Sequence, residues 1–208
     1  MGVSIHYRGK LQNLDTIYAL IEEVRDIAEV MGWKYKCMDD DWQLLPSAHL
    51  ESARDAGIRI VGSCGLKGIQ FAPAPLCEYV WLYFNAKGIL TSPFRVALDA
   101  EEGYPMQEHW LATKTQHAGV EPHIAIVKLL RYLKSKYILD LQVEDEGDYW
   151  DGGDPQKLQE CFDTVDTGLR AVNQAVERAN VSFEDSTEEV VRKIEEALRK
   201  NQSDPSGI

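Results

Sequence analysis

The chain has 208 residues, which is enough for one domain or one and a half with a sizeable buried core. Its 34 acidic and 22 basic residues give a formal net charge of −12, and such a charge opposes attraction to phosphate backbones and anionic lipid surfaces. No stretch approaches the length of a membrane span, and the amino terminus lacks an apolar run of signal-peptide length. We therefore expect neither nucleic acid nor a membrane as a partner.

The cysteines indicate a reducing compartment. The four cysteines are Cys37, Cys64, Cys77 and Cys161. They are far apart in the sequence and form no CxxC pair, so they predict neither a zinc knuckle nor a dense disulfide framework. We expect reduced thiols in a cytoplasmic protein.

The amino-terminal part predicts a strand, a helix and a second strand. Residues 3–7 alternate as a strand does, and an apolar stripe at helical spacing follows, beginning at Ile17 and closed by Gly32. Residues 33–37 read as the next strand, followed by Asp39, Asp40 and Asp41. Residues 3–37 therefore form a first βαβ-type unit.

The middle of the chain is antiparallel in character, with short strands separated by turns rich in glycine and proline. We predict strands at 57–61, 68–71, 77–84 and 89–92. Residues 47–56 could form a short helix, and residues 93–107 have few periodic cues and could cover an edge of the sheet or form a flexible flap. The glycine-rich loop 62–68 lacks the spacing of a phosphate-binding loop and is interpreted as a β connection.

Residues 110–144 predict a second βαβ-type unit. A strand at 110–115 leads through Gly119 and Pro122 into a helix whose apolar stripe runs from Ile126 to Tyr137, and a strand at 138–144 follows. The expected fold class is α/β (α+β), with a mixed, largely antiparallel sheet. The similar plan of the two units leaves open an internal duplication in a ferredoxin-like arrangement.

This second unit brings polar residues to one edge of the sheet. Strands joined through one helix are parallel, so their carboxyl ends and the amino end of the helix share an edge, where ligands often bind in α/β sheets. The candidate ligand-binding residues are Lys114, Gln116, His117, His123, Tyr149 and Trp150. The candidate metal ligands, for Mg²⁺ or Ca²⁺, are Asp145, Glu146, Asp148 and Asp151, although their spacing does not fit an EF-hand.

The same acidic residues have a structural interpretation. Carboxylates can complement the amino ends of helices, and Lys114 can pair with one of them. The leading hypothesis for function is a non-enzymatic module that binds a small molecule or a protein. The alternative is a hydrolase assisted by a divalent metal at the 114–154 edge, so the sequence leaves open whether the protein is an enzyme.

Two helices are predicted after this edge. Asp154 and Pro155 form a helix start, and the apolar stripe that follows, including Phe162, must be buried. Ser186 and Glu189 form a capping box for a last helix, before a polar tail at 201–208. We expect a sheet domain at 1–154 and a packed helical pair at 155–208, which could also form the contact in a homodimer.

Overall fold

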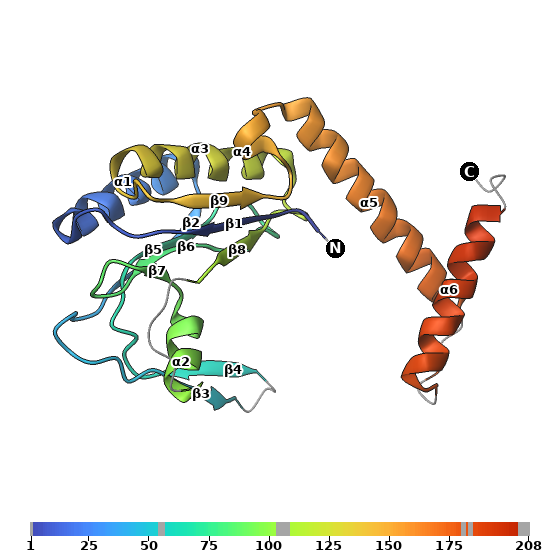
Figure 1. Ribbon diagram of the computed structural model, residues 1–208, viewed down its shortest axis with the longest axis horizontal. Helices are drawn as coiled ribbons and strands as arrows, with labels where there is room; N and C mark the ends of the chain where they lie inside the picture. The colour runs from blue at the N-terminus through green and yellow to red at the C-terminus, as the bar shows by residue number, and fades with distance from the viewer. Residues whose placement is uncertain (1, 54–56, 103–108, 180–181, 183–184, 204–208) are drawn as a thin grey trace. The chain divides into compact units, whose positions relative to one another are not determined.

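A computed structural model describes residues 2–53, 57–102, 109–179, 182 and 185–203 (Figure 1). The fold is a mixed α+β fold with antiparallel sheets, as expected. The strands are β1 (Ser4–Arg8), β2 (Lys34–Asp39), β3 (His49–Ser52), β4 (Ile58–Val61), β5 (Lys67–Ala72), β6 (Val80–Phe84), β7 (Leu90–Thr91), β8 (Leu111–Lys114) and β9 (Gln142–Asp145). The helices are the 3-10 helix η1 (Leu14–Thr16) and α1 (Ile17–Met31), α2 (Pro93–Glu102), α3 (Val120–Lys136), α4 (Tyr149–Gly152), α5 (Pro155–Arg178) and α6 (Thr187–Ser203).

The first strand lies at the centre of the three-stranded sheet, whose order is β8-β1-β9. Because β1 is antiparallel to both neighbours, β8 and β9 run in the same direction and are joined through α3. The expected parallel pair is therefore confirmed, with β1 inserted between its strands. In Figure 1, α1 and α3 lie on one side of these strands, and α2 with the β3–β4 hairpin lies on the other.

The other main sheet has four strands in the order β2-β5-β6-β7. The two strands of the first predicted unit, β1 and β2, are thus in different sheets. The sheets meet through an isolated bridge between Lys10 and Ile89 and through a backbone hydrogen bond from Glu78 to the carbonyl of Lys114. An internal duplication stays a prediction.

Two of the local predictions are wrong, and one segment for which no element was predicted forms a helix. Residues 49–52 form strand β3, where a helix was expected, because Leu50 pairs with Ile60 of β4. Residues 93–102 form a helix, which begins where the Ser92 hydroxyl accepts a hydrogen bond from the Arg95 backbone N–H. The last strand begins at Gln142 and not at residue 138, because residues 138–141 form a turn.

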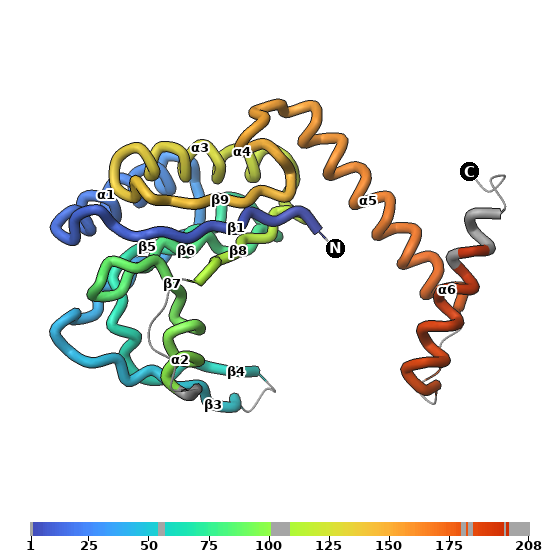
Figure 2. The backbone as a smooth tube through the Cα atoms, viewed as in Figure 1, coloured from blue at the N-terminus to red at the C-terminus, as the bar shows by residue number. Residues whose placement is uncertain are grey.

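The described residues divide into two compact units, Gly2–Leu158 and the residues from Gln159 onward. The boundary lies inside α5, and the predicted domains at 1–154 and 155–208 stay a prediction. None of the described helices has the length and apolar character needed to cross a membrane. The tube in Figure 2 follows the path of the chain through both units.

Both predicted helix starts in the carboxyl-terminal part are confirmed. The Asp154 side chain accepts the backbone N–H of Gln156, and Ser186 and Glu189 exchange the two hydrogen bonds of a capping box. The apolar stripe of α5 is only partly buried, since Leu158 and Phe162 are buried whereas Val172 and Val176 are exposed. The predicted tail at 201–208 begins as the end of α6, and residues 204–208 lie outside the described residues.

Candidate functional site

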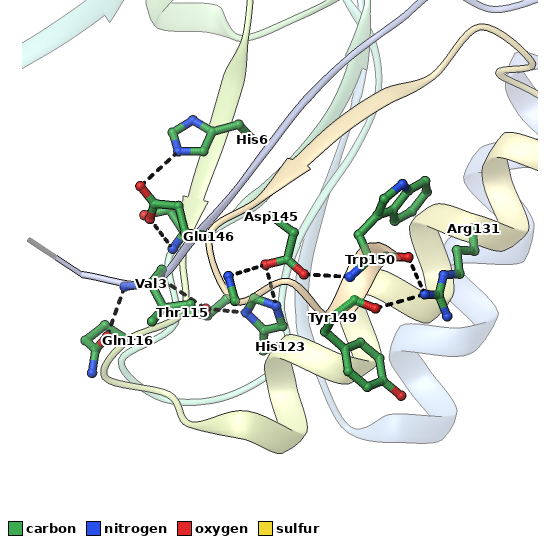
Figure 3. Close-up of polar contacts among 12 residues, drawn as sticks. Val3, His6, Thr115, Gln116, His123, Arg131, Asp145, Glu146, Tyr149 and Trp150 are labelled. Atoms are coloured by element: carbon green, nitrogen blue, oxygen red, sulfur yellow. Dashed lines mark hydrogen bonds and ion pairs between the residues drawn. The ribbon is translucent and has the colours of Figure 1, made fainter. Parts of the chain in front are cut away.

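The predicted edge is assembled around the amino-terminal strand (Figure 3). Lys114 of β8 and Asp145 of β9 pair with Ser4 and Ile5, at the beginning of β1. Just before the strand, the backbone N–H of Val3 donates to Gln116 Oε1 at 2.9 Å, and the Val3 carbonyl accepts from the N–H of Thr115 at 2.9 Å. The start of the chain is therefore bound into the edge by the β8–α3 loop.

A buried histidine and a buried carboxylate lie at the centre of this edge. His123, in the first turn of α3, places Nε2 at 2.9 Å from Asp145 Oδ1, and the two side chains are 0% and 1% exposed. The other ring nitrogen, Nδ1, lies 2.8 Å from the Thr115 hydroxyl. Because Nε2 faces a carboxylate oxygen, it must carry the proton of this contact.

Asp145 also organises the turn that follows it. Its Oδ1 accepts the backbone N–H of Gly147 at 2.8 Å, and its Oδ2 accepts that of Trp150 at 2.9 Å. Burial acts to raise the pKa of this carboxyl, but the contact with His123 and the two backbone donors outweigh burial and hold the pKa below its usual value. We call these residues, Thr115, His123 and Asp145, the buried triad.

The turn leaves no room for a side chain at Gly147. A Cβ there would lie 2.3 Å from Leu158 Cδ1, 3.2 Å from Asp145 Oδ1 and 3.3 Å from His123 Cε1. The buried triad is therefore closed over by the backbone of the acidic loop, which removes it from contact with a ligand.

The two aromatic residues of the edge fold back onto α3. Arg131 donates hydrogen bonds to the backbone carbonyls of Tyr149 and Trp150, and its guanidinium lies over both rings, 5.6 Å and 5.7 Å from their centroids. Lys134 lies 5.6 Å from the Trp150 ring centroid. Contacts of this kind hold the short helix α4 against α3.

The remaining predicted residues lie at the surface. His117, Asp148 and Asp151 are exposed, and Glu146 accepts the N–H of Ser4 at 2.7 Å while lying 3.7 Å from His6 Nε2. Among the described residues, no three His, Cys, Asp or Glu side chains lie close enough together to hold a metal ion. The metal site at Asp145, Glu146, Asp148 and Asp151 therefore stays a prediction.

The prediction that Lys114 pairs with an acidic side chain of the loop is wrong within the described part of the chain. Salt bridges there involve other cations, and the backbone N–H of Lys114 donates instead to Glu78 Oε2 at 2.9 Å. The Lys114 side chain lies beside Gly2, since a Cβ built on that glycine would be 2.9 Å from Lys114 Nζ.

The sequence did not predict the pocket that lies between α2 and strands β6 and β8. Its volume is about 220 Å³. The lining residues are Trp81, Ser92, Phe94, Arg95, Leu98, His109, Trp110, Leu111 and Ala112. We call this cavity the α2 pocket. It joins three aromatic rings with two side chains that can carry positive charge.

A buried acid anchors those two basic side chains. Asp99 is 4% exposed, and its Oδ1 lies 2.7 Å from Arg95 Nη2 while its Oδ2 lies 3.4 Å from His109 Nε2. Asp99 itself does not line the α2 pocket. Nε of Arg95 is shielded from solvent and forms no hydrogen bond with any described residue. Buried N–H donors are rarely left in this state, and the rest of the Arg95 side chain, which is 29% exposed, lines the α2 pocket.

One local signal could have revealed part of this pocket. Ser92 followed by Pro93 is a helix start, and Arg95 and Asp99 then fall one turn apart, where opposite charges meet on a helix surface. No signal links them to His109 or Trp81, because those residues come from other strands.

The comparisons add no identity. No protein-family model, no characterised protein and no solved structure matches the chain significantly. Any function must therefore be argued from the two sites described above.

Proposed function

We propose that the protein is a binding module for a small molecule, with the α2 pocket as its site. One observation carries the proposal: a cavity lined mainly by aromatic and apolar side chains contains two basic groups already held in place by buried Asp99. Ligand sites commonly have this character, with an apolar wall and a few fixed polar groups. The anchored Arg95 loses little freedom when it binds, which lowers the cost of binding.

The size of the pocket restricts the ligand. A cavity of about 150 Å³ in another protein admits a benzene ring. The α2 pocket, at about 220 Å³, therefore has space for one ring with a small substituent. Trp81, Phe94 and Trp110 supply rings against which a flat molecule can pack.

The buried triad supports this function over a metal-assisted hydrolase at the 114–154 edge. To ligate an ion, Asp145 would have to lose its two backbone hydrogen bonds and its contact with His123 Nε2. We interpret the edge as structural, so added Mg²⁺ or Ca²⁺ is expected to raise the melting temperature only slightly. A large rise that disappears in Asp148→Asn would favour the hydrolase, since an ion that binds the folded state alone stabilises it by mass action.

We also propose a cytoplasmic location and a second copy of the chain as a partner. The four cysteines, Cys37, Cys64, Cys77 and Cys161, are all free thiols in the structure, and an exposed thiol such as Cys37 fits a reducing cytoplasm. Val172 and Val176 on α5 are exposed and could form the contact in a homodimer through the carboxyl-terminal helices. A measurement of the molecular mass in solution tests this proposal.

We expect single-ring molecules to bind in the α2 pocket in the millimolar range. The probes are benzyl alcohol, benzamidine and benzoate, which are neutral, cationic and anionic, and saturation-transfer NMR detects their binding. Leu98→Trp should abolish the signal because the larger ring occupies the cavity. Ala100→Trp is the matched control, since residue 100 lies on the exposed side of α2 and does not line the pocket. The proposal is wrong if none of the three probes binds, or if Leu98→Trp binds them as wild type does.

A further inference from the structure

We infer that the α2 pocket selects a ligand that carries a carboxylate or phosphate group on a single flat ring, with Arg95 binding the anionic group. This inference rests on the proposed binding function and names the chemical class of the ligand. The protein as a whole has a formal net charge of −12 and repels anions. An anion can therefore bind only where basic side chains are nearest to it, and Arg95 and His109 line the α2 pocket.

The basic side chains lie nearer to the pocket than the acidic one. Arg95 and His109 line the cavity, whereas Asp99, which holds them both, does not. A group inside the pocket therefore meets the basic side chains at closer range than the acid. Since Asp99 is 4% exposed, water hardly reaches its contact with the Arg95 guanidinium.

Arg95 contacts Asp99 through one side of its guanidinium and lines the pocket as well. Nη2 faces Asp99 at 2.7 Å, and Nε is shielded and has no acceptor among the described residues. A guanidinium presents its N–H groups as a planar fork that matches the two oxygens of a carboxylate or phosphate. The Arg95 side chain is 29% exposed, so the part of the fork that faces the pocket can bind two oxygens of one anionic group, whereas a neutral hydroxyl offers a single uncharged acceptor.

Aromatic side chains form one wall of the pocket, and two of them are held in place by neighbouring residues. Trp110 is fixed from a second direction by Arg8, whose guanidinium carbon lies 4.6 Å from the ring centroid. Trp81 packs against Tyr79 and Tyr83, with ring centroids 6.3 Å and 5.9 Å away. Rings held in this way form a rigid surface, so a flat ligand packs against them without ordering them first.

The test compares matched ligands on wild-type protein. Benzoate and phenyl phosphate carry the anion, and benzyl alcohol has a similar size without charge. Isothermal titration is expected to show that at least one anionic probe binds about tenfold more tightly than benzyl alcohol, because a carboxylate or phosphate adds an opposite charge and a second acceptor oxygen to the hydrogen bond with the guanidinium. The ratio between the two anions tells whether the site favours carboxylate or phosphate.

The variants assign the preference to Arg95. Arg95→Gln alone would leave Asp99 buried without its partner, and the protein could then lose stability for that reason. The double variant Arg95→Gln/Asp99→Asn removes both charges and keeps two polar side chains of similar size. It is expected to bind the anionic and neutral probes equally. Arg59→Gln removes the same charge from the exposed surface of β4 and should keep the wild-type preference.

Each outcome separates this inference from the proposed function. Equal binding of charged and neutral probes by wild type, with loss of both in Leu98→Trp, would overturn the ligand class and leave the binding function standing. A preference for anions that persists in Arg95→Gln/Asp99→Asn would also overturn the role of Arg95. If no probe binds wild type, both the function and the ligand class are wrong.

Discussion

Asp145→Ala is expected to lower the free energy of unfolding by about 3–5 kcal/mol, because it removes a buried acceptor and leaves several donors unsatisfied, at about 1–3 kcal/mol each. The side chain of Asp145 is 1% exposed and accepts hydrogen bonds from the N–H groups of Gly147 and Trp150 as well as contacting His123. Alanine would leave all three donors without this acceptor. Denaturant unfolding followed by far-ultraviolet circular dichroism measures the loss.

Asp151→Ala is the matched control for this prediction. Asp151 belongs to the same acidic loop region but is exposed, so its replacement should change stability by less than about 0.5 kcal/mol. A loss of similar size in the two variants would mean that the net charge of the loop, and not the buried triad, determines stability. A loss below about 1 kcal/mol for Asp145→Ala would contradict its role in binding the turn.

The same carboxyl makes stability depend on pH in a definite direction. Its pKa in the folded protein is lower than in the unfolded chain, so the folded state binds fewer protons than the unfolded state near these values. The stabilisation is complete above the unfolded pKa of about 3.9 and is lost as the pH falls through the lower folded pKa. The difference in stability between wild type and Asp145→Ala should therefore narrow below about pH 4. A difference that stays constant from neutral pH to about pH 2 would show that the ionised carboxylate is not what stabilises the turn.

Tyr7→Phe should lower the free energy of unfolding by about 1–3 kcal/mol, the usual cost of leaving a buried donor without a partner. Tyr7 is 0% exposed, and its hydroxyl accepts the backbone N–H of Trp81 at 2.8 Å and lies 3.3 Å from the Trp81 carbonyl. The residue belongs to β1 in the three-stranded sheet, and Trp81 belongs to β6 in the four-stranded sheet. The hydroxyl therefore joins the two sheets.

Burial raises the pKa of Tyr7 to about 12, so the hydroxyl stays neutral and keeps its proton at every ordinary pH. In Tyr7→Phe the Trp81 amide should exchange its hydrogen with solvent faster than in wild type, as measured by NMR. Tyr35→Phe is the control, because that hydroxyl donates to Glu29 at the surface and its loss should cost less than about 0.5 kcal/mol. Equal losses for the two tyrosines would contradict the joining role of Tyr7.

Trp81 links the prediction for Tyr7 to the α2 pocket, whereas the prediction for Asp145 is separate from it. Trp81 contributes its backbone to the contact with Tyr7 and its side chain to the pocket wall. Asp145 lies at the other candidate site. Loss of ligand binding in Tyr7→Phe would therefore mean that Trp81 has moved. Asp145→Ala should leave the binding of the single-ring probes unchanged in protein that remains folded.

The sequence by itself determined the local elements whose signals lie within a few residues of one another. Gly32 ends α1 in the left-handed conformation at φ 67°, as a glycine after a helix stripe predicts. The caps at Asp154 and Ser186 are formed as predicted, since each depends on a side chain and a backbone N–H two or three residues away. The direction of β9 relative to β8 also followed from sequence, because a single helix between two strands restricts the connection.

Only the tertiary structure decided which polar side chains became buried. His117 and His123 looked alike in sequence, but the first is exposed and the second is closed beneath the turn at Gly147. The insertion of β1 between β8 and β9 places Val3 and Ser4 at this edge. Their hydrogen-bond partners there, Gln116 and Glu146, are more than 100 residues away along the chain. Pairings over such distances leave no periodic signal near the residues concerned.

The same reason explains why the α2 pocket was missed. Arg95 and Asp99 lie on one helix, but His109 and Trp110 precede β8 and Trp81 lies in β6, so the pocket exists only after these segments pack together. Hydrophobic periodicity determines whether a segment becomes a helix or a strand, and the packing of distant segments determines which charged groups share a cavity. The candidate function of this protein depends on that second step.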